Sequence, residues 1–233
     1  MFCLTTAGSA AAIAITVDGS GGSAASFTSI QAAINAAHTG DKIIVKPGTY
    51  VESINVDKSL TIVSESGNPS NTIVKAGKDS DDIFSVCSNG VSIKGLGIKG
   101  ARYAGVHLFG VNNCNIKYNK LSNNGCGIDL SMFGSGNTID NNQILDSVTG
   151  ISLGDSVYNS LSNNTISNCS SAISLFDSHD NTLKDNSISK NSEGISLIGD
   201  SNGNTLKSNV VKFNKKIGLH LYGTSQPVVS LNH

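Results

Sequence analysis

The chain has 233 residues and a formal net charge of −1 at pH 7, and charged residues make up 14% of it. Such a weakly charged chain argues against a protein that coats nucleic acid or binds polyanions by charge alone. It contains 35 Ser, 26 Asn and 25 Gly, no Trp and one arginine, Arg102, a mixture that favours turns over helix interiors.

We interpret residues 1–25 as an export signal and lead-in. A mildly apolar run ends in Ala12-Ile13-Ala14, which is similar to a small-residue cleavage site, although no Lys or Arg precedes it. The alternative is a first strand that begins at Ile13. No apolar run elsewhere reaches the 18 or so residues that a membrane-spanning helix needs. We therefore expect no membrane span, and a secreted or cell-surface location, either extracellular or periplasmic.

The domain itself is expected to span residues 26–233. Residues 27–37 predict a short amphipathic helix, because Ser and Thr residues that can cap it precede apolar residues at helical spacing. We expect this helix to plug the first turn of the domain. Strand-like runs follow at residues 42–46, 50–51, 60–63 and 72–74, and Pro-containing turns separate them.

From residue 105 onward the sequence is repetitive. One four-residue pattern starts at positions 105, 127, 150, 172, 194 and 218. It consists of a small residue, an aliphatic residue, any residue and then Leu. Two more short apolar segments, most of them opened by Asn, follow it in each period of about 22 residues. Each period thus predicts three short strands and three corners, and stacked copies must cover each other's apolar side chains.

This pattern predicts an all-β fold, a single-stranded parallel β-helix of about eight or nine turns. Equivalent residues of successive turns then lie about 4.8 Å apart. Asn fits such corners because it tolerates a left-handed backbone and can stack its amide on the next one. Five asparagines fall at one corner of five successive turns and are predicted to form a structural ladder: Asn119, Asn142, Asn164, Asn186 and Asn209.

Residues 30–34 (IQAAI), 40–50 (GDKIIVKPGTY) and 60–62 (LTI), together with the repeats, carry a family resemblance. They resemble the right-handed parallel β-helix proteins of the pectate-lyase-like superfamily, and are most similar to its NosD-like group. The resemblance covers residues 26–233 and implies a right-handed helix. It implies no single activity, because that superfamily contains lyases, hydrolases, esterases, adhesins and inert rods.

The catalytic motifs that the resemblance implies are absent from this sequence. The superfamily's lyases use an Arg or Lys base with calcium on clustered Asp, and its hydrolases use paired Asp with Gly-His-Gly and Arg-x-Lys. Neither Gly-His-Gly nor Arg-x-Lys occurs here. Asp79, Asp81 and Asp82 form a cluster of the kind that holds calcium, which we interpret as a solvated turn. We therefore expect no catalytic residues.

Candidate binding residues lie in the outward rows of the predicted helix, where polar groups and aromatic rings could contact a glycan. The histidines are scattered and Met132 is the only internal methionine, so we expect no metal and no cofactor. This also argues against a copper-maturation accessory. We take five residues as the candidate binding site: His107, Asp129, Asp140, Tyr158 and His220.

The sequence as a whole favours a non-catalytic secreted or cell-surface β-helix that serves as a structural, adhesive or glycan-binding module. The expected partner is a polysaccharide or a cell-envelope glycan, and neither nucleic acid nor a membrane. We interpret the lack of a polar cap after the last repeat at residues 218–221 in one of two ways: copies of the chain assemble end to end through that turn, or the sequence is part of a longer rod. The alternative is a polysaccharide lyase or glycoside hydrolase with an unfamiliar site.

Overall fold

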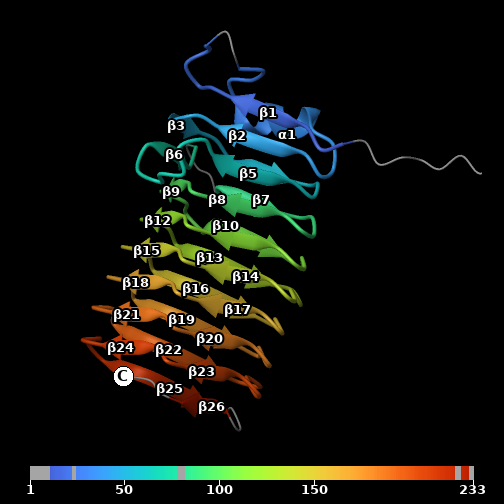
Figure 1. Ribbon diagram of the computed structural model, residues 1–233. Coiled ribbons are helices and arrows are strands. Elements are labelled where there is room, and N and C mark those ends of the chain that lie inside the picture. The colour runs from blue at the N-terminus through green and yellow to red at the C-terminus, as the bar shows by residue number, and fades with distance from the viewer. Residues whose placement is uncertain (1–10, 23–24, 78–81, 224–226, 231–233) are drawn as a thin grey trace, which may run out of the picture.

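A computed structural model of the chain describes residues 11–22, 25–77, 82–223 and 227–230. These residues wind into a right-handed parallel β-helix with three faces, each of which is a parallel sheet (Figure 1). Each strand except the last of its sheet pairs with the equivalent strand of the next turn, so the sheets run along the rod. The predicted all-β, parallel β-helical fold is confirmed.

We call the three faces sheets A, B and C. Sheet A contains β1 (Ala14–Val17), β2 (Lys42–Val45), β5 (Thr61–Ser64), β8 (Ser92–Lys94), β11 (Asn115–Lys117), β14 (Thr138–Asp140), β17 (Ser160–Ser162), β20 (Thr182–Lys184), β23 (Thr205–Lys207) and β26 (Val228–Ser230). Sheet B contains β3 (Gly48–Val51), β6 (Thr72–Lys75), β9 (Gly97–Lys99), β12 (Lys120–Ser122), β15 (Gln143–Leu145), β18 (Thr165–Ser167), β21 (Ser187–Ser189) and β24 (Val210–Lys212). Sheet C contains β4 (Ile54–Val56), β7 (Phe84–Val86), β10 (Ala104–Phe109), β13 (Cys126–Ser131), β16 (Thr149–Gly154), β19 (Ser171–Phe176), β22 (Glu193–Ile198) and β25 (Ile217–Tyr222).

The core consists of stacked columns of aliphatic side chains, because alternation along a strand turns every second residue inward. Ile139, Leu161 and Leu183 are the middle residues of three consecutive strands of sheet A and lie in register. Ile151 and Ile173 stack in the same way in sheet C. All five side chains are fully buried. The aliphatic residues that recur in the sequence are therefore the residues that form the columns in the core.

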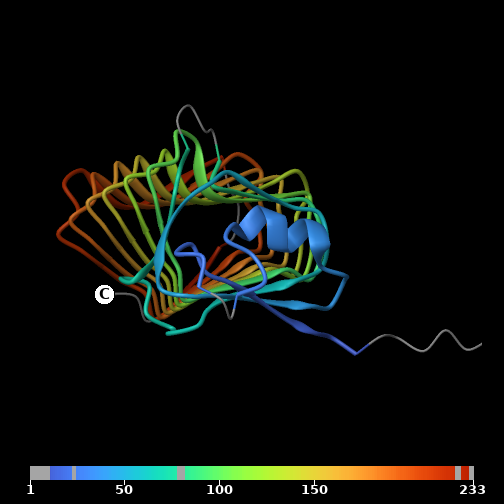
Figure 2. The same ribbon diagram turned by 90° about the horizontal axis from the view of Figure 1, so that it is seen from above.

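Helix α1 (Ile30–Ala36) covers the amino-terminal end of this core (Figure 2). Ser29 is its N-cap, and the carboxylate of Glu52 accepts hydrogen bonds from the backbone N–H groups of Ile30 and Gln31, both at 2.9 Å. The Lys58 ammonium group donates to carbonyl groups at the other end. Each charge therefore complements the helix dipole. The helix is shorter than the predicted range of 27–37, because residue 27 bridges to β1 instead.

Residues 14–17 form β1, which pairs in parallel with β2. This matches the alternative in which a first strand begins near Ile13. The rest of the segment interpreted as an export signal is only partly described, since residues 1–10 and 23–24 lie outside the described residues. Within the part of the chain that the structure describes, no helix is long and apolar enough to span a membrane.

The predicted asparagine ladder runs along the corner between sheets A and B. Asn164 is fully buried, and its Oδ1 accepts hydrogen bonds from the backbone N–H of Asn142 at 3.0 Å and from its side-chain amide at 3.1 Å. Its own amide donates to the carbonyl oxygen of Ile139 at 2.9 Å and to Oδ1 of Asn186 at 3.0 Å. The ladder thus satisfies backbone groups at the corner, where the strand hydrogen bonds are interrupted.

The ladder asparagines do not themselves adopt the left-handed backbone that we predicted for them. The left-handed backbone belongs to the residue before each ladder amide, with φ between 54° and 58°: Tyr118, Asn141, Asn163, Asp185 and Ser208. This preceding residue turns the chain, and the ladder Asn then points inward. A second ladder, which the sequence analysis did not predict, fills another corner with buried amides: Asn137, Asn159, Asn181 and Asn204.

We expect Asn164→Ala to destabilise the fold by about 2–4 kcal/mol, because it leaves buried donors and acceptors of two neighbouring turns without partners. The measurement is chemical denaturation followed by circular dichroism. Thr165→Ala is the matched control, since Thr165 is the next residue and its side chain is exposed. Equal stability of the two variants would contradict the structural role of the ladder.

Candidate functional site

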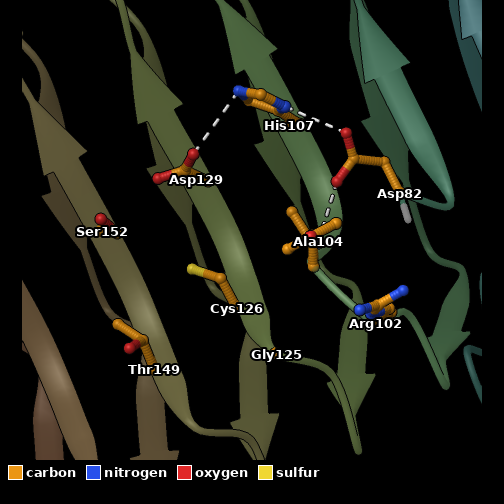
Figure 3. A pocket seen from close by; sticks show the side chains of 10 residues that line it. Asp82, Arg102, Ala104, His107, Gly125, Cys126, Asp129, Thr149 and Ser152 are labelled. Atoms are coloured by element: carbon orange, nitrogen blue, oxygen red, sulfur yellow. Dashed lines mark hydrogen bonds and ion pairs between the residues drawn. The ribbon is translucent and has the colours of Figure 1, made fainter.

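A pocket of about 480 Å³ opens on the outer face of sheet C, over β10, β13 and β16 (Figure 3). Its walls come from strands of sheet C and from the segments that precede these strands. His107 and Asp129 project from β10 and β13, Asp82 precedes β7, and Arg102 and Tyr103 precede β10. The pocket therefore gathers side chains from successive turns, which the parallel register places side by side.

The His107 imidazole lies between two carboxylates (Figure 3). Its Nδ1 is 3.0 Å from Oδ2 of Asp82, and its Nε2 is 3.5 Å from Oδ2 of Asp129. Nε2 also lies 2.9 Å from the hydroxyl of Ser131. The ring of Phe109 contacts the imidazole edge to face, with a centroid distance of 5.6 Å. The ring of His107 is thus held on several sides.

Asp82 is fixed in turn by the backbone. Its Oδ1 accepts a hydrogen bond from the N–H of Ala104 at 2.9 Å, and its Oδ2 accepts one from the Ser85 hydroxyl at 3.4 Å. The side chain is only 17% exposed. The carboxylate therefore links the segment before β7 to the start of β10 and orients His107.

The pKa values of His107, Asp82 and Asp129 are shifted in different ways. The hydrogen bond to Asp82 is the main reason why the pKa of His107 is raised, and Asp129 and Asp82 add to it by charge. Burial would raise the pKa of Asp82, but hydrogen bonds from His107 and Ala104 outweigh it, so this pKa is lowered. Burial raises the pKa of Asp129, against the attraction of His107. The two carboxyl groups thus differ in acidity because of their surroundings.

The segment before β10 depends on Gly125 in the next turn. A Cβ atom at Gly125 would collide with the carbonyl oxygens of Arg102 and Tyr103. The guanidinium carbon of Arg102 lies 5.5 Å from the centre of the Tyr103 ring, and that ring is 56% exposed. The absence of a side chain at Gly125 therefore lets this cation–aromatic pair lie beside the carboxylates.

The structure brings together two of the five residues chosen as a binding site, His107 and Asp129. Asp140 lies on sheet A, where its carboxylate accepts a hydrogen bond from the Ser162 hydroxyl at 2.7 Å. Tyr158 is exposed at the corner between β16 and β17. His220 continues the row of His107 on β25, but the row between them carries Asp129 and then three serines. The last three residues thus lie outside the pocket.

Asp79, Asp81 and Asp82 were interpreted as a solvated turn. Asp79 and Asp81 lie outside the described residues. For Asp82 the interpretation is wrong, because its side chain is largely buried against His107 and Ala104. The sequence did contain an indication that Asp82 lies beside Ala104. The two residues are 22 positions apart, which is one period of the repeat, and residues one period apart lie side by side in successive turns. Arg102 was noted only as the single arginine, and Ser131 was not singled out. Neither position carries a recurring residue that would mark it.

The fold places this chain among the right-handed parallel β-helix proteins. Within that class the chain belongs to the NosD family, whose model, described as periplasmic copper-binding protein (NosD), matches residues 34–233.

Among curated proteins the chain is similar to a cell surface glycoprotein of Methanothermus fervidus, with 36% identity over 99 residues. The match covers 42% of this chain and 16% of the glycoprotein, so it spans only a small part of that relative's length.

Similar solved structures include pectate lyase Pel9A, with a TM-score of 0.63, 14% identity, and coverage of 94% of this chain and 79% of that one. The catalytic domain of GH87 α-1,3-glucanase with nigerose has a TM-score of 0.61, 17% identity, and coverage of 84% and 43%. The periplasmic alginate epimerase AlgG has a TM-score of 0.59, 15% identity, and coverage of 83% and 58%. At these identities the likeness shows the fold alone.

The family description implies copper, which prefers imidazole and sulfur ligands. Among the residues that the structure describes, no three His, Cys, Asp or Glu side chains converge as an ion would require. Both ring nitrogens of His107 already have hydrogen-bond partners. The described residues therefore do not fit a copper site of this kind.

We expect the imidazole of His107 to titrate above its ordinary value of 6.5, because its largest perturbation is the hydrogen bond to Asp82. Asp82→Asn should lower that pKa, which NMR can follow through the ring resonances of His107. Asp180→Asn is the control, since Asp180 contacts a different histidine, His179. A His107 titration that Asp82→Asn leaves unchanged would disprove this account.

The same shift predicts how stability depends on pH. Because the folded pKa of His107 is raised, the charged ring stabilises the fold below its unfolded pKa, and this contribution is lost as pH rises through the folded pKa. His107→Asn should therefore lower the free energy of unfolding more at about pH 5.5 than at about pH 9. Urea denaturation at both pH values measures the difference. A larger loss at the higher pH would reverse the expected sign.

Proposed function

We propose that this chain is a secreted or cell-surface β-helix module that binds carbohydrate in the pocket on sheet C. The observation that carries the proposal is the pocket itself, a concavity of about 480 Å³ on the outer face of sheet C that gathers Tyr103, Arg102 and Asp129. Concave sites that combine an aromatic surface with a few fixed polar groups are typical of small-molecule binding.

The chemistry of the walls suits a sugar. Tyr103 offers an exposed ring on which the apolar face of a pyranose can stack. Asp129, Thr149 and Ser152 supply hydrogen-bond acceptors and hydroxyl groups for the sugar hydroxyls. Arg102 adds a positive charge at the same wall, which favours a glycan that carries carboxylate groups.

The comparisons support this proposal without deciding it. The names of the structurally similar proteins refer to pectate, alginate and α-1,3-glucan, which are all polysaccharides. The curated relative is a cell surface glycoprotein, and the family description is periplasmic. A location outside the cytoplasm is consistent with both.

Tyr103→Ala should weaken the binding of acidic oligosaccharides by up to about 10-fold, since stacking on one aromatic ring is worth roughly 0.5–1.5 kcal/mol. The measurement is a glycan array followed by calorimetry on the best ligand. Tyr118→Ala is the matched control, because both rings are 56% exposed and Tyr118 lies at the corner between β11 and β12. Equal losses in the two variants, or no glycan bound at all, would refute the pocket as a glycan site. Release of unsaturated or shortened products would instead support the lyase or hydrolase alternative.

Self-association through the last turn stays a prediction. Leu219 and Leu221 of β25 are 38% and 43% exposed, whereas Ile195 and Leu197, their partners one turn earlier, are 2% and 0% exposed. Because α1 covers the other end of the core, we expect copies to meet through their β25 turns rather than head to tail. Sedimentation velocity of the wild type and of Leu219→Glu should show a dimer that the charge abolishes. A wild-type monomer at high concentration would refute it.

A further inference from the structure

Three polar side chains from successive turns lie in a line on the outer face of sheet C. The hydroxyl of Ser131 is 2.9 Å from Nε2 of His107, and Nδ1 of the same ring is 3.0 Å from a carboxylate oxygen of Asp82. Both distances lie within the range of a nucleophile, its general base and the group that orients the base. We propose that Ser131, His107 and Asp82 form a hydrolytic triad that cleaves carboxylic esters.

The roles follow from the contacts. Asp82 is held by the backbone N–H of Ala104, so it can orient the ring and keep the Nδ1 proton on the side away from Ser131. Nε2 is then free to accept the proton of the Ser131 hydroxyl. The edge-to-face contact with Phe109 supports the ring in this position. Ser131 and His107 are the catalytic residues, and Asp82 is a positioning residue.

The backbone after Ser131 departs from the regular helix. Ser131 ends β13, and Met132 and Phe133 follow it with φ of 61° and 66°. In the turns above and below, Gly110 and Asp155 donate their N–H groups to Ser131 and Phe176. Among the described residues, the N–H groups of Met132 and Phe133 have no hydrogen-bond acceptor. Two consecutive left-handed residues without glycine are a strained arrangement, of the kind that gathers at functional sites.

These two N–H groups suit a negative charge. Backbone N–H groups directly after a nucleophile commonly stabilise the oxyanion that forms during acyl transfer. The neighbouring side chains are apolar and exposed: Phe109, Met132 and Phe133 are 49%, 53% and 75% exposed. They offer a contact surface for the acyl group of an ester, next to a pocket whose polar walls suit the alcohol part.

The reaction balances without a cofactor. Oγ of Ser131 attacks the ester carbonyl carbon and its proton passes to Nε2 of His107. The oxyanion then collapses, the bond to the alcohol breaks, and His107 gives the proton to the departing alkoxide. Water next attacks the acyl carbon and gives a proton to Nε2, and Oγ takes that proton as its bond to the acyl carbon breaks. Ester and water thus yield acid and alcohol.

Asp129 modulates this chemistry. Its carboxylate is 3.5 Å from Nε2, so it competes with Ser131 for that nitrogen and favours the charged ring. Asp82 acts in the same direction, and burial of the ring acts against both. The Arg102 guanidinium lines the same pocket. Only the neutral ring can act as a base, so hydrolysis should increase as pH rises through the raised pKa of His107. Asp129→Asn should move this rise to lower pH.

The proposal is tested with 4-nitrophenyl acetate and with a fluorophosphonate probe, which modifies activated serines. We expect the wild type to hydrolyse the ester and to carry one adduct, mapped to Ser131 by mass spectrometry. Ser131→Ala should abolish the adduct and lower kcat/KM by at least about 100-fold. Asp82→Asn should lower kcat while KM stays near its original value, because Asp82 does not touch the ester.

Ser174→Ala is the matched control. Ser174 lies on the same face in β19 with similar partial exposure, and its neighbours in register are Ser152 and Ser196 rather than an imidazole. It should keep wild-type activity and labelling. Thermal denaturation of each variant separates loss of activity from loss of fold.

A wild type that neither hydrolyses the ester faster than Ser131→Ala nor takes up the probe would overturn the proposal. Labelling of Ser174 to the same extent as Ser131 would overturn it too. The test does not depend on glycan binding, since neither probe contains a sugar. Failure here therefore leaves the Tyr103 experiment to decide the proposed function separately.

Discussion

The parallel register between successive turns is the constraint on which the rest of this structure depends. Most strands of sheets A and B have only three or four residues, too few to be stable alone, so each is held by the strands above and below it. The weak points are the corners, where strand pairing is interrupted. Buried amides such as Asn164 and Asn159 bridge those points, because an amide can both donate to one turn and accept from another.

The same register creates the pocket. Asp82 and His107 are 25 residues apart and His107 and Ser131 are 24 apart, yet winding places them side by side on one face. In the later turns one outward row of that face repeats serine, at Ser152, Ser174 and Ser196. Where one turn departs from the pattern, at Arg102 and Tyr103 and again at Met132, the face becomes irregular and chemically distinct. Function in such a rod is therefore expected where the repeat is broken.

Membership of the NosD family settles the fold and leaves the chemistry to individual side chains. The inward residues of a β-helix serve packing, and they are the ones that the repeat preserves along the chain. The outward residues are free to differ from turn to turn, which explains why solved structures at 14–17% identity share this fold under names with different activities. The described histidines of this chain lie apart, and its polar cluster is built of carboxylates, hydroxyls and one imidazole.

The sequence by itself determined the solenoid, its period and the positions of its core columns, because stacking requires like residues such as Ile139, Leu161 and Leu183 to recur at equal spacing. It also placed His107 beside Asp129. Only the tertiary structure decided that Asp82 turns toward His107 and that Ser131 lies within reach of the same ring. Those contacts are diagonal across turns or come from loops, where side-chain direction depends on local backbone angles that no periodic pattern records.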